Sequence, residues 1–216
     1  MDYKVIPSIL TDTLAHFEEQ AQVLENFADY IQVDYVDGYF APELTCCEAK
    51  VIREVDIACP LEAHLMVEDP MAQVRDWYKA GAARVIGHIE EMEDQVEFTE
   101  LLSKLGLEVG LALSLDTPLS DLNYQIVGGL NVVLLMAHEV GVQGSPFHDE
   151  VLVKIKDLRN RYPHLNIEVD GGVNEHTILK AKEAGANYFA VGKDILAAKD
   201  PAAEYRKLLA LITNAN

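Results

Sequence analysis

Short apolar runs alternate with longer amphipathic segments along the whole chain. The apolar runs are nearly continuous in hydrophobic residues, which is typical of strands buried on both faces of a parallel sheet. The predicted strands span residues 4–10, 30–34, 61–66, 84–88, 108–113, 131–136, 166–169 and 188–191. Their regular spacing predicts one large α/β sheet.

Between the strands, apolar residues recur at the three- and four-residue spacing of a helix that covers a sheet. The predicted helices span residues 14–27, 48–54, 70–79, 94–105, 119–126, 150–162, 175–184 and 201–212. Thr11 or Asp12 is the candidate N-cap of the first helix. Evenly spaced strand–helix units favour closure into a single (β/α)8 TIM barrel over a doubly wound open sheet. We therefore expect residues 1–216 to form one barrel domain.

Composition narrows the function classes. The formal net charge is −19, and such an acidic surface repels polyanions, so we expect no nucleic-acid partner. The same charge opposes anionic substrates, so a phosphate would have to be held by local N–H groups. No apolar run approaches the length of a membrane span. The three cysteines, Cys46, Cys47 and Cys59, form no disulfide framework, which favours a cytoplasmic location.

In a barrel of this kind, chemistry lies at the C-terminal ends of the strands. The polar residues at or just after those ends are Ser8, Gln32, Asp34, His64, His88, Ser114, Glu139, Asp170 and the Gly192-Lys193 turn. Asp34, His64 and Asp170 could together hold a divalent ion such as zinc, manganese or iron(II). Two aspartates facing each other across a substrate carbon could remove a proton from one face and return one to the other. An acidic barrel mouth that binds nothing is the alternative.

The segment from Ile167 to Val173 carries the strongest single motif, because an apolar run ends in Asp170 and is followed by Gly171 and Gly172. The glycines allow close approach of backbone to a ligand, and we expect the following helix to point free N–H groups at the same spot. The alternative is a tight turn with an acidic cap. We expect His16, His138, His148, His164 and His176 to lie in loops or on the surface, while the position of His88 is ambiguous.

At these residues the chain resembles the ribulose-phosphate 3-epimerase family. The matching motifs are Ile6-Pro7-Ser8-Ile9-Leu10, residues 33–42, Ala63-His64-Leu65-Met66-Val67 and residues 168–173. The resemblance implies a metal-dependent isomerase that inverts carbon 3 of a ketose phosphate through an enediolate, in pentose phosphate metabolism. It maps the acid and base onto Asp34 and Asp170, and the metal ligands onto these two with His64 and position 32.

The resemblance also maps substrate-binding positions. These are Ser8, Met66, Gly141, Gly144, Gly171, Gly172, Gly192 and Lys193. It implies a phosphorylated ketose as substrate and a divalent metal ion as cofactor, and it leaves a homo-oligomer open.

Two departures from the family pattern keep alternatives open. Gln32 stands where the family has a metal-binding histidine, so its neutral amide should weaken a transition-metal site. A non-catalytic or metal-free sugar-phosphate-binding homologue is therefore one alternative. A related sugar-phosphate decarboxylase or aldolase is another, but Val36 occupies the position of the lysine in the signature of those enzymes.

Overall fold

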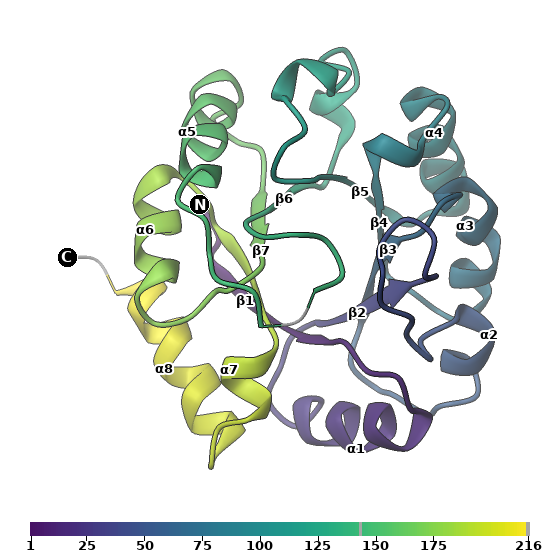
Figure 1. Cartoon of the computed structure of the whole chain (residues 1–216), viewed down its shortest axis with the longest axis vertical. Helices are drawn as coiled ribbons and strands as arrows, with labels where there is room; N and C mark the ends of the chain where they lie inside the picture. Colours follow the sequence, from purple (N-terminus) through teal and green to yellow (C-terminus); the bar gives the residue numbers. More distant parts are fainter. Residues whose placement is uncertain (143, 215–216) are drawn as a thin grey trace.

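The computed structural model describes residues 1–142 and 144–214, and its centre is a closed barrel of eight parallel strands in chain order (Figure 1). The strands are β1 (Lys4–Ile9), β2 (Ile31–Val36), β3 (Leu61–Met66), β4 (Arg84–His88), β5 (Glu108–Leu113), β6 (Val132–Met136), β7 (Ile167–Asp170) and β8 (Tyr188–Val191). Pairing of β1 with β8 closes the barrel. The predicted (β/α)8 TIM barrel is therefore confirmed.

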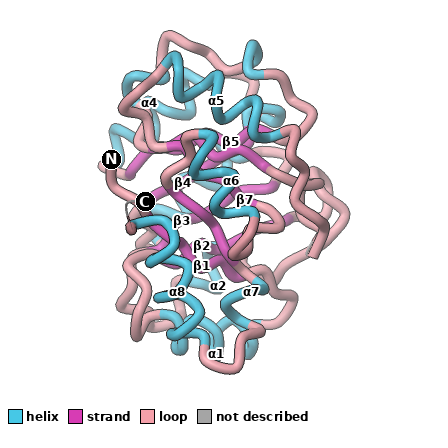
Figure 2. Tube along the Cα trace, turned by 90° about the vertical axis from the view of Figure 1, so that its left-hand side faces the viewer, coloured by secondary structure: helices cyan, strands magenta, loops and turns pink. Residues whose placement is uncertain are grey.

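Helices surround the barrel, and in the side view the strands run through the middle with helices outside them (Figure 2). The helices are α1 (Leu14–Leu24), α2 (Ala49–Ile52), α3 (Pro70–Lys79), α4 (Gln95–Leu105), α5 (Val151–Arg161), α6 (Thr177–Ala184), α7 (Lys193–Leu196) and α8 (Pro201–Thr213). Short 3-10 helices are η1 (Ile89–Glu91), η2 (Leu119–Asp121) and η3 (Val127–Gly129). Among the described residues, none of the helices combines the length and apolar character needed to cross a membrane.

The predicted helix over residues 119–126 is wrong, because η2 and η3 replace it. Its apolar spacing is real, and Leu119 and Leu122 are buried. However, the Asn123 side chain accepts a hydrogen bond from the Gln125 amide, and the Asn123 amide donates to the side chain of Gln95. Such side-chain bonds offer the backbone an alternative to the helix.

The first helix also differs in its cap. Thr13, rather than Thr11 or Asp12, accepts a hydrogen bond from the His16 amide, and α1 ends at Leu24. The unpredicted helix α7 follows Gly192 directly after β8.

The main core lies between the outer surface of the barrel and the helices, and it includes Phe17, Trp77 and Phe98. At the N-terminal end of the barrel, buried Arg84 pairs with Glu62 and donates from Nε to Glu108 at 2.8 Å. The register of β3, β4 and β5 places these three residues side by side. Charged side chains thus occupy the interior at this end of the barrel.

Candidate active site

A cavity of about 430 Å³ opens at the C-terminal ends of the strands. Its lining includes the predicted positions Ser8, Asp34, Met66, Gly141, Gly144, Asp170, Gly171, Gly172, Gly192 and Lys193. Inward-facing residues of β1, β2, β3 and β7 form its floor, and the loops after β6, β7 and β8 form its walls. The structure thus brings together side chains that lie far apart in the sequence.

Two carboxylates of the floor approach the imidazole of His64, which is fully buried and does not itself line the cavity. His64 Nδ1 lies 3.1 Å from Asp34 Oδ1 and 3.3 Å from Asp170 Oδ2. Asp34 and His64 are direct partners in the register of β2 and β3, and Asp170 ends β7. One potential ligand atom from each of the three residues lies within 4.8 Å of the other two.

The side-chain amide of Gln32 lies beneath this group and is fully buried. Gln32 and Asp34 are two apart in β2, so both point into the barrel. Gln32 Nε2 donates to Asp34 Oδ1 and to Asp170 Oδ2, both at 2.7 Å. Its Oε1 is buried without a hydrogen-bond partner among the described residues.

The two carboxyl groups differ in acidity. Burial raises the pKa of Asp34, and repulsion from Asp170 raises it further. Burial acts in the same direction on Asp170, but hydrogen bonding to His64 and its positive charge outweigh it, so the pKa of Asp170 is lowered. Burial opposes protonation of His64, yet its bonds to Asp170 and Asp34 raise its pKa to about 9. Of the two, Asp34 is therefore the more readily protonated and Asp170 the more readily ionised.

The donor set of this floor fits a divalent cation. Two carboxylates and an imidazole nitrogen converge, and such ligands suit zinc, manganese or iron(II). The unpartnered Oε1 of Gln32 adds a fourth donor, because rotating the amide by half a turn would direct this oxygen at the same group. The rotated amide would face two carboxylates without a donor, which is favourable only beside a cation.

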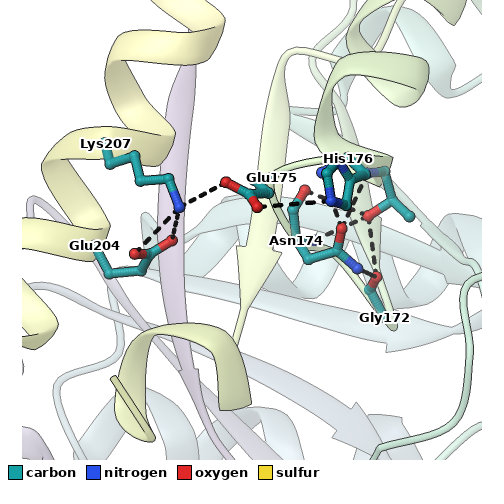
Figure 3. A network of polar contacts seen from close by, with 7 residues as sticks. Gly172, Asn174, Glu175, His176, Glu204 and Lys207 are labelled. Carbon is teal, nitrogen blue, oxygen red and sulfur yellow. Dashed lines mark hydrogen bonds and ion pairs between the residues drawn. The ribbon is translucent and has the colours of Figure 1, made fainter. Parts of the chain in front are cut away.

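The wall formed by the β7–α6 turn is fixed by its own side chains (Figure 3). Asn174 Oδ1 accepts from the amides of His176 and Thr177, and Thr177 Oγ1 donates to the Gly172 carbonyl. Glu175 forms an ion pair with Lys207 of α8 at 2.6 Å. The expectation that this helix offers free N–H groups is therefore wrong for these two amides, because the Asn174 side chain already uses them.

The adjacent glycines serve packing as well as approach to the cavity. Gly171 and Gly172 have φ values of 108° and 63°, which side chains disfavour. A Cβ on Gly171 would lie 2.4 Å from the ring of His138, and one on Gly172 would lie 2.5 Å from the Phe147 backbone nitrogen. The loop after β6 therefore lies directly on this turn.

Comparison with known proteins identifies the family. A model of the ribulose-phosphate 3-epimerase family matches residues 4–196. The chain belongs to this family. It is 35% identical to a ribulose-phosphate 3-epimerase, cytoplasmic isoform, of Oryza sativa over 92% of this chain and 89% of the relative. It is 33% identical to the ribulose-phosphate 3-epimerase of Escherichia coli, over 96% and 93%.

Solved structures of other enzymes share the fold at lower identity. A 3-hexulose-6-phosphate synthase is 20% identical with a TM-score of 0.75, covering 97% of this chain and 100% of that one. An orotidine 5'-monophosphate decarboxylase from Sulfolobus solfataricus is 15% identical with a TM-score of 0.65, covering 98% of each chain. These likenesses support the barrel fold alone.

Within this epimerase-family barrel, two histidines differ in position. His138 lies in the loop after β6, as expected, but it is buried and lines the cavity against Gly171, which the sequence did not indicate. His88 is fully buried and does not line the cavity, but its Nε2 lies 3.0 Å from His64 Nε2. Burial and the charge of His64 lower the pKa of His88, which favours its neutral ring.

The remaining candidate residues at the strand ends lie at different places relative to the cavity. Ser114 and Glu139 are absent from the cavity lining, although the Ser114 amide donates to Glu90 at 2.7 Å. Gly192 lies against Ser8, and a Cβ there would meet Ser8 Oγ at 3.0 Å. No pattern in the sequence pointed to Glu90, because a glutamate just beyond a strand is ordinarily a solvated residue.

Proposed function

We propose that this protein inverts carbon 3 of a ketose phosphate, with ribulose 5-phosphate as its substrate. The observation that carries the proposal is the pair of buried carboxyl groups, Asp34 and Asp170, held around one point on the cavity floor. The names of the curated relatives agree with this reaction.

The two aspartates take the roles of base and acid. Asp170, which favours the ionised form, removes the proton from carbon 3, and the bonding electrons move toward the adjacent carbonyl to give an enediolate. Asp34, the more readily protonated of the two, returns a proton to carbon 3 on the opposite face. Reaction in the other direction exchanges the two roles. Two carboxyl groups whose surroundings give them different pKa values are suited to act as base and acid.

A divalent cation would be held by Asp34, His64 and Asp170, with Oε1 of Gln32 as the fourth donor. Such a cation supplies positive charge that stabilises negative charge on substrate oxygens. Oxygen donors suit manganese better than zinc. We therefore assign manganese as the preferred ion, because Gln32 contributes an oxygen where an imidazole would favour zinc.

The phosphate group binds at the cavity wall, between the loops after β6, β7 and β8 and away from the floor. Lys193 Nζ lies close to Gly144, at 3.9 Å from the position of a Cβ there, and both residues line the cavity. Among the backbone hydrogen bonds of the described residues, the amides of Lys193 and Asp194 donate to no group. An ammonium group and two backbone amides can hold a phosphate despite the acidic surface.

Deuterium exchange tests the reaction directly. The protein is incubated with ribulose 5-phosphate in deuterated water, with added manganese, iron(II) or zinc, and carbon 3 is monitored by NMR. We expect deuterium at carbon 3 and the appearance of the epimer. Absence of exchange with every metal contradicts the proposal.

A second candidate is a metal-free phosphosugar-binding protein. The Gln32 amide, which bridges Asp34 and Asp170, favours it because both carboxylates are already satisfied without a cation. This candidate predicts that calorimetry detects phosphosugar binding while no deuterium enters at carbon 3. It also predicts that elemental analysis finds no bound metal. A decarboxylase or aldolase is not favoured, because buried Val36 stands at the lysine position of those enzymes.

A further inference from the structure

A line of buried hydrogen bonds continues from the cavity floor toward η1. His64 Nε2 lies 3.0 Å from His88 Nε2, and His88 Nδ1 lies 3.0 Å from Glu90 Oε2. Both imidazoles are fully buried, and they meet edge to edge with ring centroids 5.2 Å apart and planes inclined by 23°. Neither His88 nor Glu90 lines the cavity, so any role in the reaction must pass through His64.

Glu90 determines which atom donates and which accepts in these hydrogen bonds. Its Oε1 accepts from the Ser114 amide at 2.7 Å, and its Oε2 faces His88. Burial alone would favour the protonated acid, but the bonds from His88, Thr117 and Ser114 outweigh it and lower the pKa of Glu90 to about 2. An ionised carboxylate only accepts hydrogen bonds, so His88 must donate from Nδ1.

The tautomer of His88 then fixes that of His64. A neutral imidazole that carries its proton on Nδ1 presents a lone pair at Nε2. Because His88 Nε2 is the acceptor of the 3.0 Å contact, His64 Nε2 must be the donor. When His64 gives up its Nδ1 proton to bind a cation, the neutral ring that remains keeps its proton on Nε2 and turns the lone pair of Nδ1 toward Asp34 and Asp170.

We propose that Glu90 and His88 are positioning residues that hold His64 in its Nε2–H tautomer, so that Nδ1 is free to bind a divalent cation. This inference rests on the metal site of the proposed function. It assigns a role to two residues that touch neither the cavity nor the candidate cation.

The surrounding structure makes this support rigid. Lys154 of α5 donates from Nζ to the Ser114 carbonyl at 2.9 Å and also to the carbonyls of Leu115 and Thr117. It thereby fixes the loop whose amide holds Glu90. The centroid of the Phe40 ring lies 4.9 Å from that of the His88 ring, so Phe40 packs against this imidazole. Such support restricts the ring to one orientation.

The variant Glu90→Gln should exchange donor and acceptor along these hydrogen bonds while the side chain keeps almost the same shape. Its amide oxygen can still accept from the Ser114 amide, so its NH2 group faces His88 Nδ1. His88 then carries its proton on Nε2, His64 must accept there, and the His64 proton moves to Nδ1. We expect manganese affinity to fall about 10- to 100-fold, measured from free Mn²⁺ by electron paramagnetic resonance. The exposed neighbour Glu93→Gln has the same charge change and should keep the wild-type affinity.

The wild-type protein gives an independent measurement that does not depend on a variant folding. Long-range ¹H–¹⁵N NMR of protein labelled at histidine and loaded with Zn²⁺, which is diamagnetic, reports each tautomer. We expect Nδ1–H for His88 and Nε2–H for His64. Normal metal binding with Nδ1–H on His64, or wild-type manganese affinity in folded Glu90→Gln, overturns this inference alone. A wild-type protein that binds neither ion overturns the metal site of the proposed function together with it.

Discussion

Gln32 of β2 donates from one side-chain nitrogen to Asp170 of β7 at 2.7 Å and also to Asp34 at 2.7 Å. The two candidate acid/base residues are thus joined by an amide where the family pattern implies a metal-binding imidazole. Rotation of this amide would exchange two hydrogen bonds for one oxygen ligand. Occupancy of the metal site and orientation of Gln32 are therefore coupled.

Replacing Gln32 by histidine should strengthen zinc binding by about tenfold or more, because an imidazole nitrogen replaces a neutral amide oxygen. Competitive titration with a chromophoric chelator measures the affinity. The control is Gln32→Leu, which is similar in size but has no donor atom, and it should bind zinc more weakly than wild type. Equal affinities for the three proteins would show that position 32 does not contact the cation.

Asp34→Asn and Asp170→Asn should each lower the rate of epimerisation by about 10²- to 10⁴-fold, the usual contribution of a general acid or base. The rate is followed by NMR of ribulose 5-phosphate in deuterated water. Glu139→Gln provides an exposed control near the same loop and should keep the wild-type rate. Retention of activity in either aspartate variant would contradict the two-aspartate mechanism.

The barrel could be predicted from the sequence because both faces of its strands are buried. Predicted bounds for β3, β4, β5 and β8 match the structure, since each apolar run is flanked by polar or turn residues. After β5, the spacing of apolar residues was not enough to predict the structure correctly. There, hydrogen bonds of the Asn123 side chain and amide replace the helix that the apolar spacing indicated.

The site was predictable where it depends on strand ends, and less so where loops fold back. Asp34, His64 and Asp170 lie together because parallel strands place their C-terminal ends at one end of the barrel. The sequence cannot show that the loop after β6 returns onto Gly171, so the place of His138 in the cavity lining was missed. Glu90 was missed for a similar reason, because its importance depends on His88 and the Ser114 amide.

Lys193 should determine much of the affinity for the phosphate group. Lys193→Met keeps the length of the side chain but removes the ammonium charge, and we expect phosphosugar affinity to fall about tenfold, as for loss of a charged hydrogen bond. Isothermal titration calorimetry with ribulose 5-phosphate measures it. Lys199→Met removes an exposed charge beyond α7 and should leave the affinity unchanged. An equal loss in both variants would indicate a general charge effect rather than a phosphate contact.

Glu90 should also make stability depend on pH in a defined window. The folded pKa of about 2 lies below the ordinary value of 4.5, so ionised Glu90 stabilises the folded state above pH 4.5. This stabilisation, on the order of 3 kcal/mol at neutral pH, is lost as the pH falls from 4.5 toward 2. Glu90→Gln lacks it, so its deficit in unfolding free energy should be largest at pH 7 and shrink by more than half at pH 3.

Urea unfolding of wild type and variant at pH 7, 5 and 3 measures this difference in free energy. Glu93→Gln, with an exposed side chain, should remain within about 0.5 kcal/mol of wild type at each pH. A deficit in Glu90→Gln that stays constant from pH 7 to pH 3 would mean that the loss comes from packing and not from ionisation. In that case His88 would donate to a group whose charge does not matter, and Glu90 could not set the direction of the hydrogen bonds that lead to His64.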